Sequence, residues 1–98
     1  MANNMGAITQ AEIEKFAALV IRELNLDGWR MEWTRASPSI CEKNRQIIFI
    51  DKTWIGRYPW EAKEVVLHEV AHIFTDDKFH GLGFYREYIE LLEKFMAI

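Results

Sequence analysis

All three histidines of this 98-residue chain, His68, His72 and His80, fall within thirteen residues. The first two belong to the pattern HEVAH over residues 68–72, in which Glu69 follows the first histidine. On an α-helix, positions i and i+4 lie on one face, so both imidazoles can reach the same metal ion. A glutamate beside such an ion can act as the base for a water molecule. The pattern therefore predicts zinc chemistry: one Zn²⁺ ion is held by His68 and His72, and Glu69 is the catalytic residue.

A third protein ligand is expected, because catalytic zinc has three protein ligands and leaves its fourth position to water. His80 is the leading candidate for this ligand. Seven residues separate it from His72, which is enough for the chain to reverse after a helix. The competing ligands are four carboxylates: Asp76 and Asp77 in the intervening turn, and Glu87 and Glu90 on the helix that follows.

A tyrosine hydroxyl beside catalytic zinc can donate a hydrogen bond to the developing oxyanion. Two tyrosines, Tyr85 and Tyr88, follow His80 closely. Tyr88 lies on the apolar stripe of the last predicted helix and is interpreted as a core residue, so Tyr85 is the candidate donor. Cys41 is the only cysteine and is interpreted as a small, partly buried strand residue, because a metal-binding role would normally need a second cysteine.

The first half of the chain predicts one helix and three strands. Thr9 and Glu12 form a capping-box pattern that starts a first helix, which ends within residues 25–28. Residues 29–34 alternate between apolar and polar side chains, which is typical of a strand with one buried face. Residues 40–42 and 46–51 then flank a polar turn, so we expect a β-hairpin. The second arm of this hairpin is apolar on both faces and should be covered on both.

The second half predicts two helices. Pro59 suits the first turn of a helix, where its missing N–H would have no partner in any case. This helix should run to about Thr75, carry the HEVAH pattern and be mostly buried. The last helix follows His80, and its apolar stripe comprises Phe84, Tyr88, Leu91 and Phe95. The expected fold class is α+β in the order α-β-β-β-α-α, with a small three-stranded sheet and a central HExxH helix.

The HEVAH pattern, followed by the sequence HGLGF over residues 80–84, resembles the SprT-like zinc metallopeptidases of the zincin superfamily. In that family an HExxH motif precedes an HGxxF-like element. The resemblance implies a compact zincin-like domain over about residues 9–97, with His80 as the third zinc ligand and Glu69 as the general base. It also implies hydrolysis of peptide bonds by a zinc-activated water, with a protein or peptide as the substrate. The interval between the two motifs is shorter than is usual in that family.

Length and charge restrict the remaining classes of function. Ninety-eight residues predict one domain over residues 1–98, with a flexible segment at residues 1–8. The net charge of −3 argues against a nucleic-acid-binding surface. No signal-peptide pattern or stretch of transmembrane length is present, so we expect a cytoplasmic protein that does not associate with membranes. The sequence leaves the oligomeric state open.

Two other functions fit the same histidines. A zinc-dependent hydrolase of another class, such as a ribonuclease, could use the same three-histidine geometry, although the acidic balance counts against it. A non-catalytic module, in which zinc only stabilises a small fold, predicts a site closed by a fourth protein ligand.

Overall fold

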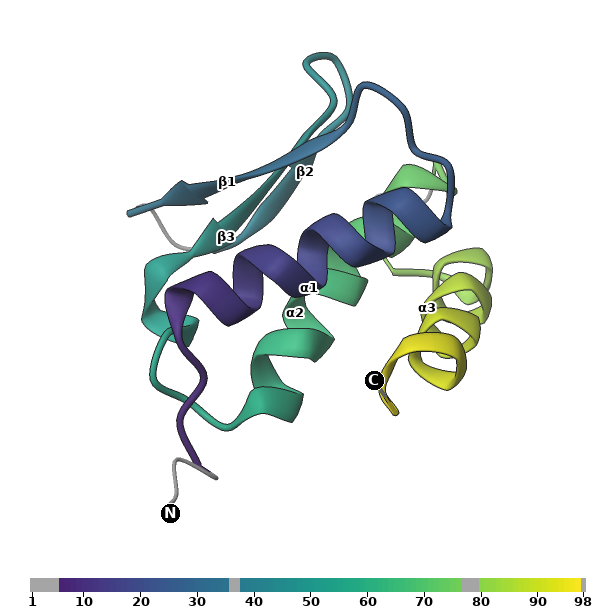
Figure 1. The fold of residues 1–98 in the computed structure, drawn as a ribbon. Coiled ribbons are helices and arrows are strands. Elements are labelled where there is room, and N and C mark those ends of the chain that lie inside the picture. Colours follow the sequence, from purple (N-terminus) through teal and green to yellow (C-terminus); the bar gives the residue numbers. More distant parts are fainter. Residues whose placement is uncertain (1–5, 36–37, 77–79, 98) are drawn as a thin grey trace.

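The computed structural model describes residues 6–35, 38–76 and 80–97. In this part of the chain, helices pack against one side of a three-stranded sheet (Figure 1). The elements are α1 (Gln10–Glu23), β1 (Arg30–Thr34), β2 (Ile40–Glu42), β3 (Ile47–Asp51), a short 3-10 helix (Lys52–Trp54), α2 (Pro59–Ile73) and α3 (Leu82–Phe95). The predicted α+β class and the order α-β-β-β-α-α are confirmed, and the described part of the chain adds the short 3-10 helix between β3 and α2. None of these helices is long and apolar enough to cross a membrane.

Helix α1 begins at the predicted capping box. The Thr9 hydroxyl accepts a hydrogen bond from the Glu12 N–H at 3.1 Å, and the Glu12 carboxylate accepts one from the Thr9 N–H at 2.9 Å. These two bonds satisfy N–H groups that would otherwise have no partner within the helix. The residues of α1 that face the core are Ile13, Phe16, Ala17 and Val20.

Strand β3 is the centre of the sheet, which has the order β1-β3-β2. Strands β2 and β3 pair antiparallel, with Cys41 opposite Ile48, so the predicted hairpin is confirmed. Strand β1 pairs with β3 in parallel, with Glu32 opposite Phe49, which makes the sheet mixed. As predicted for an arm that is apolar on both faces, Ile47, Ile48 and Ile50 are all buried.

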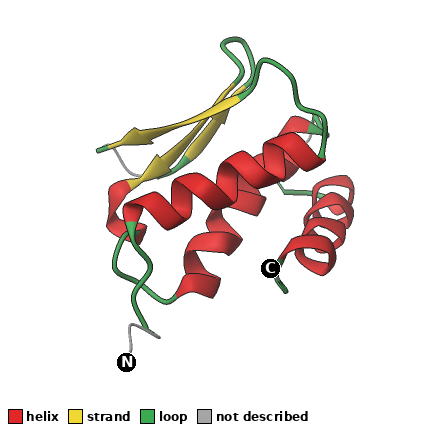
Figure 2. Cartoon of the chain, viewed as in Figure 1, coloured by secondary structure: helices red, strands yellow, loops and turns green. Residues whose placement is uncertain are grey.

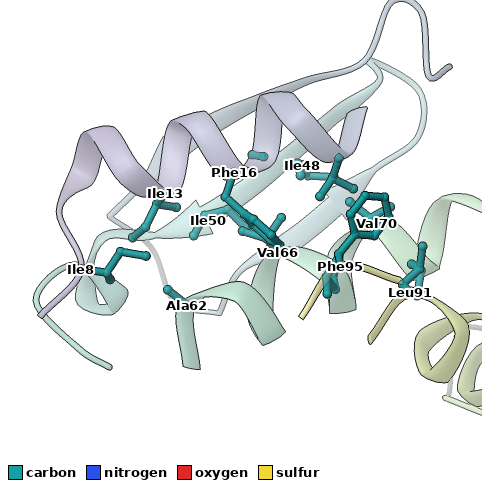
Figure 3. Packing of buried hydrophobic residues seen from close by; sticks show 14 of the residues in the cluster. Ile8, Ile13, Phe16, Ile48, Ile50, Ala62, Val66, Val70, Leu91 and Phe95 are labelled. Atoms are coloured by element: carbon teal, nitrogen blue, oxygen red, sulfur yellow. The ribbon is translucent and has the colours of Figure 1, made fainter. Parts of the chain in front are cut away.

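The core lies between the sheet and the helices, where side chains from every layer meet (Figure 3). Phe16 from α1, Ile50 from β3 and Val66 from α2 are buried together in this cluster. The cluster also includes Ile8, which the sequence assigns to a flexible segment. Ile8 accepts a backbone hydrogen bond from the Gly56 N–H at 2.8 Å, which ties this residue to the loop before α2. Residues 1–5 of the same segment lie outside the described part of the chain.

Helices α2 and α3 pack against each other and carry the residues of chemical interest (Figure 2). Six of the fifteen residues of α2 are buried, and the others except the exposed Trp60 are partly buried; the buried residues are Ala62, Val66, Leu67, Glu69, Val70 and Ala71. The helix ends at Ile73, slightly before the predicted end near Thr75. On α3 the buried positions are Phe84, Leu91 and Phe95.

Candidate metal centre

Two elements bring the three histidines together. Helix α2 presents His68 and His72 one turn apart, with ring centroids separated by 5.1 Å. His80 precedes Gly81, the N-cap residue of α3, and its backbone φ of 56° lies in the left-handed region. The Nε2 atom of His80 is 3.2 Å from the Nε2 atom of His68 and 3.1 Å from that of His72. The described structure thus joins the predicted pair on α2 to the predicted third histidine.

The spacing of these nitrogen atoms fits a single metal ion. Ligand atoms from all three histidines lie within 4.8 Å of one another. Nitrogen ligands in a tetrahedral zinc site are about 2.0–2.1 Å from the ion, which places neighbouring nitrogens about 3.3 Å apart. The two measured separations, 3.2 and 3.1 Å, are close to this value. Three histidines are therefore close enough to hold a metal ion, and imidazole nitrogen is a donor that zinc accepts well.

The ring of Phe84 packs against all three imidazoles. Its ring centroid lies 4.9 Å from that of His68, 4.5 Å from that of His72 and 4.6 Å from that of His80. The side chain of Phe84 is completely buried. A rigid aromatic ring in contact with all three imidazoles restricts their rotation, which favours a preformed site. This packing gives a physical reason for a phenylalanine four residues after His80.

The electrostatic surroundings favour the neutral form of His68. Burial, together with the neighbouring His72 and His80, lowers the pKa of His68 to about 4. A neutral imidazole has a lone pair available for a metal ion, whereas a protonated ring has none. At neutral pH, His68 is therefore already in the form that binds metal.

Glu69 lies beside the histidines on α2 and is only 5% exposed. Burial raises the pKa of its carboxyl group to about 8, so Glu69 holds a proton more readily than an exposed glutamate does. When Glu69 is ionised, its negative charge also acts on Cys41 of strand β2. Burial, together with this charge, raises the pKa of the half-buried Cys41 thiol to about 11. The interpretation of Cys41 as a partly buried strand residue is confirmed.

The histidines and Glu69 open onto a cleft of about 970 Å³ between α2 and the β2 side of the sheet. Ile40 and Cys41 of β2 form one wall. The aromatic part of the lining consists of Trp54, Trp60 and Tyr88, and the acidic part includes Glu61 and Glu64. A volume of this size is within the range of ligand sites in proteins, which is roughly 300–1,000 Å³.

The structure brings Tyr88 to the site, although the sequence favours Tyr85. Tyr88 lines the cleft, and its ring centroid lies 5.6 Å from that of His68. Burial and the carboxylate of Glu64, which accepts a hydrogen bond from the Tyr88 hydroxyl, raise the pKa of Tyr88 to about 12. Tyr85 is 49% exposed and is not among the lining residues of the cleft. The sequence signal that could have found Tyr88 is its position four residues after Phe84, on the face of α3 that meets the histidines.

The competing carboxylate ligands do not join the histidines in the described part of the chain. The group of potential ligand atoms there comprises His68, His72 and His80. Asp76 lines the cleft but is fully exposed, and it forms an ion pair with Lys43 at 3.5 Å. Glu87 and Glu90, both on α3, lie outside this group. Asp77 falls outside the described residues.

Comparison of the sequence with known proteins does not assign a function to this site. No model of a known protein family matches the chain, and no curated protein matches it either.

Proposed function

We propose that this protein is a zinc-dependent metallopeptidase in which His68, His72 and His80 bind one Zn²⁺ ion and Glu69 is the general base. One observation carries the proposal: three imidazole nitrogens converge at a cleft whose wall also contains the buried Glu69. A site that only stabilised the fold would not need an open cleft or a buried carboxyl group beside it. The resemblance of the HEVAH and HGLGF elements to those of SprT-like zincins supports the same reaction class.

Zinc, when bound, polarises a substrate carbonyl and lowers the pKa of a water molecule towards neutrality. The residues of the chain then supply positioning and proton transfer. In its ionised form, which a pKa of about 8 makes the main form at mildly alkaline pH, Glu69 takes the proton of the attacking water and passes it to the amine that leaves. Tyr88 is better placed than Tyr85 to contact a substrate, because it lines the cleft beside His68. Without substrate, the Glu64 carboxylate accepts the hydrogen bond of the Tyr88 hydroxyl. When a substrate binds, a substrate oxygen replaces this carboxylate as the acceptor.

A peptide fits the cleft better than a nucleic acid does. Strand β2 forms one edge of the described sheet and also lines the cleft, and its Ile40 is 47% exposed. An extended peptide can add to such an edge through backbone hydrogen bonds, in the mode known as β-augmentation. By contrast, Glu61 and Glu64 in the cleft would repel the phosphates of RNA. The substrate class that we propose is therefore an extended segment of protein or peptide.

The substitution Glu69→Gln tests the mechanism. It keeps the size of the side chain and removes the base, so we expect hydrolysis of an unfolded protein such as casein to fall by a factor of about 100 or more. Zinc content, measured by mass spectrometry of the metal, should stay at one ion per chain, because Glu69 is not a ligand. The matched control is Glu23→Gln at the exposed end of α1, which should keep full activity.

Each result of this experiment has a separate meaning. Full casein hydrolysis by the Glu69→Gln variant would contradict the role of Glu69. If the unmodified protein hydrolysed RNA and not casein, it would be a hydrolase of another class and not a peptidase. Stoichiometric zinc without hydrolysis of either substrate would indicate a stabilising metal site.

A further inference from the structure

Helix α3 carries more apolar surface than the other described elements of the chain cover. One stripe, comprising Phe84, Leu91 and Phe95, is buried in the core. A second stripe lies beside it and is exposed: Leu82 is 70% exposed, Tyr85 49% and Ile89 53%. Figure 1 shows α3 at the border of the molecule, where it packs against α2. Contiguous apolar side chains on the surface of a helix usually mark an interface.

The exposed stripe has the spacing of a helix pair. Its positions are Leu82, Tyr85, Ile89, Leu92 and Met96, which are separated alternately by three and four residues. Leu92 and Met96, the last two, are only partly exposed, because they also pack against the core, and they extend the stripe to the end of the helix. Alternating intervals of three and four keep apolar residues on one seam between two helices that pack side by side. We name these five residues the outer seam of α3.

Two charges beside the outer seam indicate what covers it. Arg86 and Glu93 are both exposed and lie seven residues apart, on the same flank of the seam. If two copies of α3 pair antiparallel about a two-fold axis near Ile89, Arg86 of each copy faces Glu93 of the other. The same surface then serves both partners, as a two-fold symmetric interface requires. A parallel arrangement gives these two charges no such opposite partners.

We propose that the protein forms a homodimer in which the outer seams of two α3 helices pair antiparallel. This inference is independent of the proposed function, because it uses none of the metal ligands. In the dimer, Leu82 lies opposite Met96 of the second copy, and Ile89 meets its symmetry mate. Tyr85 then has a role in the interface, which accounts for its position outside the cleft. The two histidine clusters lie at opposite ends of the helix pair, roughly 25 Å apart along the axis at 1.5 Å per residue.

The first test is the mass of the protein in solution, measured by sedimentation equilibrium with and without Ile89→Glu. The unmodified chain of 11.6 kDa should sediment at twice this mass, because apolar burial on the seam favours association. Ile89→Glu places two like charges at the symmetry axis and should give a monomer. The matched control is Tyr58→Glu, which changes a side chain of similar exposure, 57%, at the start of α2 and should leave the dimer intact. A monomeric unmodified protein at about 100 μM would overturn the proposal, and so would a dimer that survives Ile89→Glu.

The second test is a charge-reversal cycle that identifies the antiparallel pairing. Arg86→Glu and Glu93→Arg should each weaken dimerisation about tenfold, because each creates two like-charge contacts. The double variant restores opposite charges and should return the dissociation constant close to its original value. Lys94→Glu, on the exposed face of α3 that points away from the outer seam, serves as the charge control and should have no effect. Single effects that persist in the double variant would rule out the antiparallel dimer. Because these positions are exposed, the cycle does not depend on substitution of a buried residue.

Discussion

The backbone of His80 has a φ of 56°, in the left-handed region that favours glycine and is unfavourable for most other residues. The other two histidines have ordinary helical positions on α2. The proposed third ligand therefore reaches the site through a backbone conformation that costs stability. Residues held in this way are found at functional sites, where the surrounding structure maintains them. At the scale of single residues, the backbone conformation that would let His80 bind a metal ion is therefore one that lowers the stability of the fold.

This conflict predicts the order of stability of two variants. In the metal-free protein, His80→Gly should be more stable than His80→Ala by about 1 kcal/mol, because glycine adopts the left-handed region without a Cβ clash. Both variants lose the same imidazole contacts with Phe84, so the comparison isolates the backbone. Urea denaturation in the presence of a chelator measures the difference. Equal stability of the two variants would show that the backbone at this position is not strained.

The site could be predicted from the sequence where helix geometry alone decides it. His68 and His72 share a face because they are four residues apart on α2. The approach of His80 depends on a left-handed residue and on the packing of Phe84, and neither follows from spacing. The choice between Tyr85 and Tyr88 depends on where the core stripe of α3 meets the cleft, which is a tertiary property.

Among the elements, helix α3 connects the core to the histidines. Phe84 is buried under all three imidazoles, and Phe95 is buried further along the same helix. Both phenylalanines hold α3 in the core, yet only Phe84 contacts the histidines in the described structure. A loss of packing at the two positions should therefore affect stability in both cases and metal binding in one.

The substitutions Phe84→Leu and Phe95→Leu form a matched pair for this prediction. Each should lower the free energy of unfolding by about 1–3 kcal/mol, because each leaves the core less well filled. Only Phe84→Leu should also weaken zinc binding, because it removes the aromatic ring that packs against the three imidazoles and orients them. Competition with a chromophoric chelator measures the affinity of the folded variants. A similar loss of affinity in Phe95→Leu would mean that the effect is global.

The arrangement of strands was less predictable than their existence. Alternating residues indicate which face of β1 packs against the core, where Met31 and Trp33 are partly buried, and the turn between β2 and β3 indicates a hairpin. Neither pattern states that β1 pairs in parallel with β3 and leaves β2 at the other edge. The choice of partner strand depends on how the whole sheet packs against the helices, and the side chains of β1 alone do not encode it.

At the scale of the whole molecule, ninety-eight residues support only a modest core. The stability of a domain of this size is the small difference between large opposing terms. A ligand that binds only the folded chain adds to this difference. The three histidines come from two different segments, the helix α2 and the residue before the N-cap of α3, so a metal ion on them would link the two helices.

Zinc should therefore stabilise the entire fold. At a free zinc concentration about 100 times the dissociation constant, the added free energy is about 2.7 kcal/mol. For a chain of this length, the midpoint of thermal unfolding should rise by roughly 10 °C or more. Scans with zinc and with a chelator, at one fixed protein concentration, measure the shift. His72→Ala should abolish it, and a shift that persists in that variant would place the metal elsewhere.

The position of Cys41 has a practical consequence for chemical labelling. It is the only thiol in the chain, and it lies in the cleft wall on β2, within reach of the charge of Glu69. Because burial raises its pKa to about 11, the thiol stays protonated at neutral pH and reacts slowly with alkylating reagents. A probe attached to this sulfur is therefore attached at one known place. Its signal reports on the cleft itself, without background from a second thiol.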